Sequence, residues 1–513
     1  MASRKRFALN VVMNWVSTAV GMVVPFFLMP FVVRHLGPVV YAVWILAVST
    51  VSYLNLLDLG LRSAIIRYVS KGQTEGKVDE AQSAIGAALW FRLLIGAGVA
   101  GLSIVLAFAF PHLFKIPHDL QHAAQVTVLL CALGVAISLV AGVFGGVLSA
   151  ISRFDILSSI TIGQTLARAV GVILILRSGR GLISLAYWEF TVILLSGLTT
   201  CLSALRLYPT CRVRLRQPDI TTLKKIWAYS FKTFIIIVAV QIVFYTDNLV
   251  VGAFLSLGAV TLYSIAGSLA MYSGQVALAM GSTFIPMASS LDAAGRSKDL
   301  QKLLLRGTQA SLGLMLPIGL TLLLRGKTFI ALWMGPKLGP EFSQTSGVIL
   351  QILLITQFFT IANATGGQIA YGVDKHKTVA LWATIEAAAN LGLSIVLVKT
   401  IGIYGVAWGT SISQAIVHLY FWPRYVKKEL GVPIRRYLWD GWAKITLCGI
   451  PFGVASVIAD RYWHAGSMVV YFMQIFSLLP VYALTVLVVF HEEVGNVFQQ
   501  WKASRNGTPA TIA

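Results

Sequence analysis

The 513-residue sequence is poor in charge, since only 12% of its residues are Asp, Glu, Lys or Arg. An ordinary soluble protein carries about 25%. Hydrophobic residues make up 57% of the sequence, and apolar runs of about 20 residues recur along it with no soluble-sized segment between them. These runs are longer and more continuous than the alternating segments of about 10 residues in a transmembrane β-barrel. The sequence therefore predicts an all-α polytopic membrane protein.

Cysteine is scarce, and its spacing is not that of a metal site or a disulfide framework. The four cysteines are Cys131, Cys201, Cys211 and Cys448, which lie in or beside apolar runs. The histidines form no ligand cluster in the sequence, and it contains no GxxxxGK[ST] nucleotide-binding motif. We therefore expect no metal and no cofactor.

Acidic residues are also few: 19 Asp and Glu stand against 40 Lys and Arg, a net charge of +21. In a soluble protein this excess would indicate nucleic acid, but Lys and Arg also collect in the cytoplasmic loops of membrane proteins. With the N-terminus in the cytoplasm, about 27 basic residues fall in cytoplasmic segments and about 9 outside. This bias predicts that both termini are cytoplasmic, with membrane lipids as partners and no nucleic acid.

The apolar pattern predicts about 14 transmembrane helices. We expect them at roughly 8–33, 40–61, 82–110, 123–149, 155–176, 182–205, 227–254, 259–285, 307–324, 345–371, 379–398, 403–423, 444–459 and 467–490.

A shift of 221 residues aligns two parts of this pattern and places Gly171 on Gly392 and Gly181 on Gly402. Each repeat contains six spans, so both insert with the same orientation. The sequence thus predicts two parallel six-helix lobes plus two extra C-terminal helices, an arrangement typical of alternating-access carriers. We expect an N-lobe at 1–208, a basic cytoplasmic linker at 209–226, a C-lobe at 227–427, and helices 13 and 14 with a cytoplasmic tail at 428–513.

Polar and ionisable residues within the spans are the candidate functional residues. The first lobe offers six for a substrate-binding cavity: Asp58, Arg62, Arg92, Arg168, Asn14 and Gln164. Asp58 and Arg62 lie four residues apart, so on a helix they share one face and can pair. The second lobe offers Asp247 and Glu386 as candidates for ion coupling.

Three arginines at membrane depth need a polar environment. Each costs about 2.5–3.5 kcal/mol at the centre of a spanning helix, so the three would cost about 10 kcal/mol if they faced lipid. They must face a wet cavity, an acidic partner or an anionic ligand, and the guanidinium fork suits phosphate and carboxylate oxygens. Other interpretations remain open: Asp58 and Arg62 as a satisfied pair near the surface, and Asn14, Asp247 or Glu386 as hydrogen-bonding groups between helices.

Three stretches carry a resemblance to a known family: DLGLRSAIIRYVSK at 58–71, GGVLSAISRFDILSSITIGQTLARAVGVILIL at 145–176 and TDNLVVGAFLSLGAVTLYSIA at 246–266. The sequence resembles the bacterial polysaccharide flippases of the multidrug/oligosaccharidyl-lipid/polysaccharide exporter superfamily. This resemblance implies a multi-pass protein of the bacterial inner (plasma) membrane. It also implies translocation of undecaprenyl-pyrophosphate-linked oligosaccharide from the cytoplasmic to the periplasmic leaflet, for cell-surface polysaccharide biosynthesis.

The resemblance further implies that cationic residues of the first-lobe cavity receive the anionic pyrophosphate head, and Arg62, Arg92 and Arg168 are the residues placed to do so. A polysaccharide polymerase and chain-length machinery are candidate partners. The alternatives are a drug or cation antiporter of the same superfamily and a membrane-embedded polysaccharide polymerase or ligase. An antiporter would favour an acidic cavity, and an enzyme would need a larger outside loop than 110–122 or 325–344. We therefore expect a carrier and not an enzyme.

Overall fold

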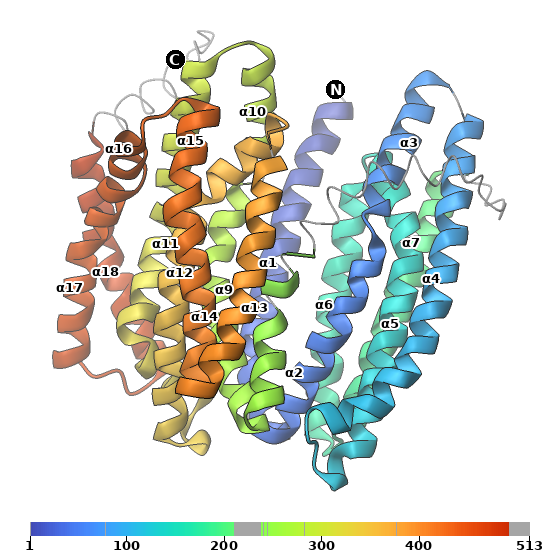
Figure 1. Ribbon diagram of the computed structural model, residues 1–513, viewed down its shortest axis with the longest axis horizontal. Coiled ribbons are helices and arrows are strands. Elements are labelled where there is room, and N and C mark those ends of the chain that lie inside the picture. Colours follow the sequence, from blue (N-terminus) through green and yellow to red (C-terminus); the bar gives the residue numbers. More distant parts are fainter. Residues whose placement is uncertain are drawn as a thin grey trace. The chain divides into compact units, whose positions relative to one another are not determined.

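The computed structural model describes residues 2–76, 78–209, 238–239, 241–243, 245–281, 283–375 and 377–491. The chain divides into two compact units, Met1–Ser264 and Ile265–Ala513. Every regular element in the described ranges is a helix (Figure 1). Nearly all of the predicted linker at 209–226 lies outside these ranges. The lobe boundaries inferred from the sequence therefore stay a prediction.

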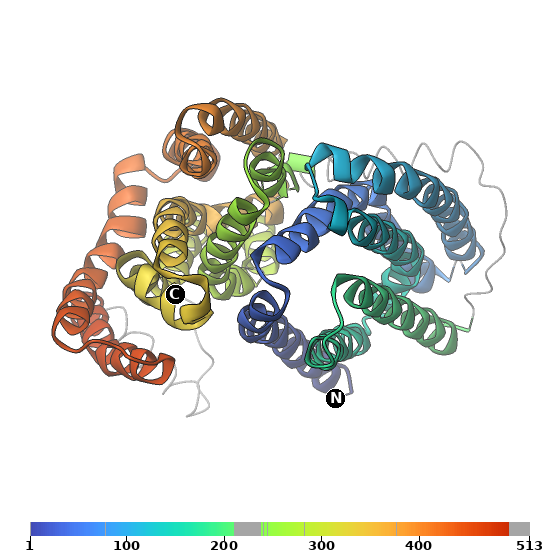
Figure 2. The ribbon, with the colours of Figure 1, turned by 90° about the horizontal axis from the view of Figure 1, so that it is seen from below.

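The first unit consists of long antiparallel helices joined by short connections. They are α1 (Ala2–Leu36), α2 (Pro38–Ser52), the 3₁₀ helix η1 (Tyr53–Asp58), α3 (Leu61–Glu75), α4 (Val78–Leu113), α5 (His118–Ala150), α6 (Phe154–Arg177) and α7 (Leu182–Leu207). Residues 245–254 are helical, and α9 (Leu257–Gly281) crosses the boundary between the units. Helix α5 packs against α4 and α7, while α1 packs along α6 (Figures 1 and 2).

The second unit continues with a similar series of helices. They are α10 (Phe284–Ala293), α11 (Ser297–Met334), η2 (Pro336–Leu338), α12 (Pro340–Gly372), α13 (Lys377–Ile401), α14 (Ile403–Ile416), η3 (Val417–Phe421), α15 (Trp422–Leu430), α16 (Ile434–Arg436), η4 (Tyr437–Ala443), α17 (Lys444–Tyr462) and α18 (Met468–Val489). Of these, η3 and η4 are π-helices. Helices α17 and α18 pack against α11.

Eleven helices in the described part of the chain are long and apolar enough to cross a membrane. They coincide with eleven of the fourteen predicted spans. Of the other three, 227–254 is described only in part, and 259–285 corresponds to α9, whose 25 residues extend about 37 Å, more than the hydrocarbon core. The last, 403–423, is α14 continued through η3. The fold is therefore the predicted all-α polytopic one.

The element order repeats as the 221-residue shift predicts. Helix α2 with η1, then α3, α4, α5, α6 and α7 corresponds to α9, then α10, α11, α12, α13 and α14. Both series also interrupt their first helix at the corresponding place, before α3 and before α10. Helices α17 and α18 follow the second series, and the described part of the chain holds no counterpart of them in the first.

The two predicted outside loops are shorter than the sequence suggests. Helix α4 runs to Leu113 and α5 begins at His118, so only 114–117 connect them. Helix α11 runs to Met334, so the predicted loop at 325–344 is wrong for its first half. Apolar residues continue past Arg325, where the helix kinks but does not end.

Candidate functional site

The stretch 54–71 is two helices and not one. The 3₁₀ helix η1 ends at Asp58, Leu59 and Gly60 have φ values of 51° and 70°, and α3 begins at Leu61. Positive φ is strained for leucine and natural for glycine. The predicted Asp58–Arg62 pair is wrong, because the i,i+4 geometry exists only within a continuous helix.

Asp58 instead pairs with Arg92 of α4. The Arg92 side chain is 1% exposed, whereas that of Asp58 is 31% exposed. Arg92 Nη1 also donates to the carbonyl of Leu139 on α5 at 2.7 Å. A Cβ at Gly142 would lie 3.3 Å from this nitrogen, so a glycine helps α5 to approach. Arg92 thus joins η1, α4 and α5 from a buried position, and of the two side chains Asp58 is the one that faces solvent.

Arg62 lies in the first turn of α3 and is exposed. Its Nη2 lies 3.4 Å from Ser149 Oγ, at the end of α5. Among the described residues no carboxylate pairs with Arg62. A guanidinium with only a neutral hydroxyl partner keeps most of its capacity to bind an anion.

Arg168 of α6 pairs with Glu189 of α7 through two parallel hydrogen bonds. Nε and Nη2 donate to the two carboxylate oxygens, each at 2.6 Å. The Arg168 side chain is 38% exposed and that of Glu189 is 14% exposed. Arg168 is therefore held in a fixed orientation and still has surface that a ligand can reach.

Trp188 sets the approach of α6 to α7 beside this pair. Its indole Nε1 donates to the carbonyl of Ala167 at 3.1 Å. A Cβ at Gly171 would lie only 2.0 Å from the Trp188 ring, so the absence of a side chain there makes room for the indole. Trp188 and Glu189 are neighbours in sequence, so seating Trp188 also positions Glu189 against Arg168.

The three arginines lie at different levels along α5. Arg62 contacts Ser149 and Arg92 contacts Leu139, ten residues or about 15 Å apart along the helix axis. The level of Arg168 follows from its partner Glu189 on α7. One turn further along α7, Ile193 packs against Gly134 of α5, which lies before Leu139 on that helix. Arg62, Arg92 and Arg168 are therefore spaced along the direction of the helix axes and do not form a single cluster.

Polar side chains of α1 meet α6 near the N-terminus of α6. Asn10 donates to the Ser152 carbonyl at 3.0 Å and accepts from the Asp155 backbone N–H at 2.9 Å. Asn14, one turn further along α1, is exposed, and Gln164 on α6 is partly exposed. Asn10 thus bonds between helices, whereas Asn14 and Gln164 remain accessible.

Asp247 lies among hydrogen-bonding side chains of three elements. It is 6% exposed, and its Oδ2 accepts from Tyr263 of α9 at 2.6 Å. The adjacent Thr246 bonds to Tyr53 of η1. In this conformation Asp247 therefore acts as a hydrogen-bonding group between helices, as one of the interpretations of the sequence allowed.

Glu386 of α13 is partly exposed. Within the described ranges it has no hydrogen bond or ion pair, although Asn390, one turn on, donates to Thr410 of α14 at 2.8 Å. The two residues considered for ion coupling are thus in different settings. Asp247 is buried and hydrogen-bonded, whereas Glu386 is partly exposed and has no partner among the described residues.

One buried charge cluster was missed from the sequence. Arg325, at the kink of α11, is 1% exposed and its Nε donates to Asp460 of α17 at 2.8 Å. The guanidinium also bonds Gln474 and lies 4.7 Å from the ring centroid of Tyr471, both on α18. The sequence signal was two basic residues, Arg325 and Lys327, placed between two apolar runs.

Comparison with known proteins identifies the family. The family profile described as "Polysaccharide biosynthesis protein" matches residues 7–292. The chain belongs to this family. The matched range includes all six candidate binding residues and Asp247, and it leaves out Glu386.

Named relatives are distant but cover most of the chain. The chain is 24% identical over 446 residues to the uncharacterized membrane protein EpsK of Bacillus subtilis, covering 83% of this chain and 84% of that protein. It is 22% identical over 424 residues to a putative O-antigen transporter of Shigella flexneri, covering 79% and 95%.

Solved structures show the same fold. The lipid II flippase MurJ in its inward closed conformation matches with a TM-score of 0.73 at 17% identity, covering 95% of this chain and all of that one. An inward-facing MATE family multidrug transporter matches with a TM-score of 0.68 at 15% identity, covering 89% of this chain. This member of the polysaccharide biosynthesis family is a multi-pass membrane protein with the fold of MurJ and the MATE transporters.

Proposed function

We propose that the chain is a flippase that moves undecaprenyl-pyrophosphate-linked oligosaccharide from the cytoplasmic to the periplasmic leaflet of a bacterial inner membrane. Family membership and the MurJ-like fold support a lipid-linked substrate. The observation that carries the proposal is the series of three arginines along α5, in which Arg62 has no described acidic partner and Arg168 is half-accessible. The product is used for cell-surface polysaccharide.

The chemistry of such a substrate explains the need for arginine. The pyrophosphate and sugars cannot enter hydrocarbon without losing their hydration, whereas the polyprenyl tail can remain in lipid. A carrier therefore needs a polar path through the membrane, lined by fixed cations for the head group and open to the lipid for the tail. The guanidinium fork binds phosphate oxygens through two parallel hydrogen bonds.

Each candidate residue takes a distinct part in this proposal. Arg62 receives the pyrophosphate, and Arg168 offers its exposed edge while Glu189 holds the other. Arg92 reaches the head group only in a conformation in which Asp58 releases it. Asn14 and Gln164 offer amides to sugar hydroxyls.

Movement between leaflets would follow alternating access of the two repeats, with both termini in the cytoplasm. If an ion gradient drives it, Glu386 is the better candidate, because it has no described partner, whereas Asp247 already accepts from Tyr263. Alternatively, net transport toward the periplasmic leaflet is driven by consumption of the product by a polysaccharide polymerase and chain-length machinery.

A drug or cation antiporter is the second candidate, favoured by the likeness to a MATE transporter. The arginine series argues against it, since a cationic substrate would be repelled. A polymerase or ligase is disfavoured, because the connections at 114–117 and 335–339 are too short for a catalytic domain.

Deletion in the native host tests the proposal. Lipid-linked oligosaccharide should accumulate in the cytoplasmic leaflet and surface polysaccharide should disappear, with both restored by the wild-type chain. Normal surface polysaccharide without accumulation would refute the function. Accumulation of unpolymerised units already in the periplasmic leaflet would instead indicate a polymerase or ligase.

A further inference from the structure

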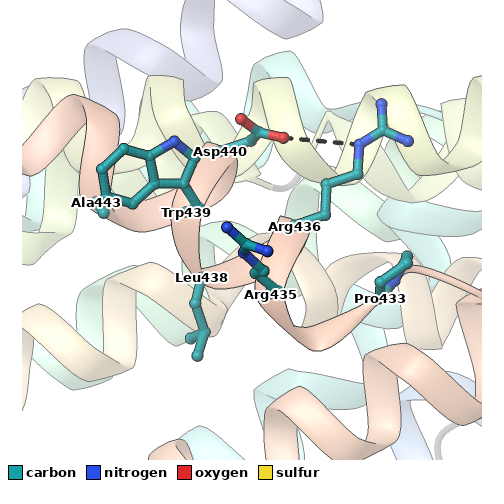
Figure 3. Close-up of a pocket in the computed structure, with 7 residues that line it drawn as sticks. All are labelled: Pro433, Arg435, Arg436, Leu438, Trp439, Asp440 and Ala443. Carbon is teal, nitrogen blue, oxygen red and sulfur yellow. Dashed lines mark ion pairs between the residues drawn. The ribbon is translucent and has the colours of Figure 1, made fainter.

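A surface pocket of about 650 Å³ lies in the second unit, and none of the residues proposed for transport lines it (Figure 3). All its lining residues come from one short segment: Pro433, Arg435, Arg436, Leu438, Trp439, Asp440 and Ala443. This segment forms the beginning of the candidate membrane span Ile434–Tyr462. The pocket therefore lies where the span meets the membrane surface.

The backbone of the pocket is fixed from behind. The segment enters the π-helix η4 at Tyr437, which is fully buried and donates to the Ala362 carbonyl at 3.2 Å and to Asn363 Oδ1 at 2.9 Å. A π-helix is rare and frequent at functional sites. With Tyr437 held inward, the exposed side chains of Arg435, Arg436 and Trp439 stand on a rigid support.

The pocket carries an excess of positive charge. Asp440 lies 3.7 Å from Arg436 (Figure 3). It also accepts from Lys444 at 2.8 Å, so one carboxylate is shared by two cations. Arg435 is exposed, and among the described residues it has no ion pair or hydrogen bond. Lys444 does not line the pocket, but it follows the lining residue Ala443 directly, so three cations in this segment stand against one anion. The Arg435 guanidinium is open to a ligand.

An apolar surface lies beside these cations. Trp439 is 54% exposed, and Leu438 lines the same pocket. Exposed tryptophan next to Lys and Arg at the edge of a span is typical of the membrane–water interface. A soluble anion would use the arginines but would gain nothing from the indole, whereas a lipid would use both.

We propose that this pocket binds the phosphodiester head group of an anionic phospholipid in the adjoining leaflet. Arg435 and Arg436 contact the phosphate oxygens, Lys444 is drawn to the charge, and Trp439 lies along the glycerol and the start of the acyl chains. Basic clusters directly beside a membrane span recognise anionic lipids in this way. The site does not depend on the transported substrate.

Native mass spectrometry of the full chain in detergent tests this site, with dioctanoyl phosphatidylglycerol, dioctanoyl phosphatidylcholine and inorganic phosphate as separate probes. The pocket variant is Arg435→Ala with Arg436→Ala. The matched control is Lys427→Ala with Lys428→Ala on α15, which removes the same charge from exposed positions outside the pocket.

Phosphatidylglycerol should bind the wild type more tightly than phosphatidylcholine does. The pocket variant should weaken phosphatidylglycerol binding by about tenfold or more, because charge-assisted hydrogen bonds are lost, and the control by less than about twofold. If both variants weakened phosphatidylglycerol binding equally, the lipid would be held by general electrostatic attraction, and the proposal of a specific site at this pocket would be wrong. Inorganic phosphate binding as tightly as phosphatidylglycerol, equal binding of the two lipids, or no effect of the pocket variant would overturn the lipid assignment.

Discussion

At the scale of single residues, two arginine–carboxylate pairs in the first unit differ in burial and therefore in role. Arg92 is 1% exposed and joins three elements through Asp58 and the Leu139 carbonyl. Arg168 is 38% exposed, and in the described ranges Glu189 is its one ion-pair partner. Burial makes Arg92 primarily a residue that holds the helices together, whereas Arg168 can exchange its partner for a ligand.

Alanine at each position should separate these roles. Arg92→Ala removes a fully buried side chain and its hydrogen bond to the Leu139 carbonyl, which should cost about 2–5 kcal/mol of stability. Arg168→Ala should cost less than Arg92→Ala, because the Arg168 side chain is 38% exposed and fills less of the packing between helices, yet it should abolish surface polysaccharide.

Thermal unfolding of the purified variants and complementation of the deletion strain measure the two effects. Arg168→Lys is the control that keeps the charge and loses the fork, and it should restore transport only in part. Full complementation by Arg168→Ala would remove this residue from the substrate path. Equal losses of stability in both alanine variants would contradict the assignment of Arg92 to the scaffold.

At the scale of elements, the contact of α6 with α7 depends on one glycine. Gly171 leaves space for Trp188, whose neighbour Glu189 holds Arg168. Close approach of membrane helices commonly relies on such small residues. The orientation of Arg168 is thus set partly by a residue that does not touch it.

Gly171→Ala should displace Trp188 and with it the Arg168–Glu189 pair, since the new Cβ would lie 2.0 Å from the indole. Overpacking of this kind costs about 1–3 kcal/mol, and transport should fall with it. Gly163→Ala is the matched control, because nothing lies within 4 Å of its added Cβ on the same helix, and it should be neutral or slightly stabilising. Adding Trp188→Phe to Gly171→Ala should recover part of the stability, and identical behaviour of the two glycine variants would contradict the role of Gly171.

At the scale of the whole molecule, composition and periodicity were enough to predict the fold. Apolar runs of spanning length and a constant 221-residue shift predicted the helices and their repeated order, because the bilayer imposes the same length on every span. The same reasoning failed where the backbone departs from a helix. Leu59 with positive φ gives no sequence signal, so the break after Asp58 was missed and Arg62 was paired with it.

The polar contacts were hard to predict because their partners are distant in sequence. Arg92 meets Asp58 from another helix, and Arg325 meets Asp460 at a separation of 135 residues. The position of a charge within an apolar span shows that it needs a polar partner. Spacing rules find partners only within one helix, so they could not identify these. For Arg168 the need for a partner was recognised, and its pairing with Glu189 came only from the structure.

The central claim is that the chain moves a pyrophosphate-linked lipid by means of cations in its first unit. The most direct measurement is flipping of undecaprenyl-pyrophosphate-linked oligosaccharide in proteoliposomes, followed by access of an external probe to the sugar. The wild type should equilibrate the substrate between leaflets, while Arg62→Ala with Arg168→Ala should be no faster than protein-free vesicles. Flipping by the double variant at the wild-type rate would contradict the account.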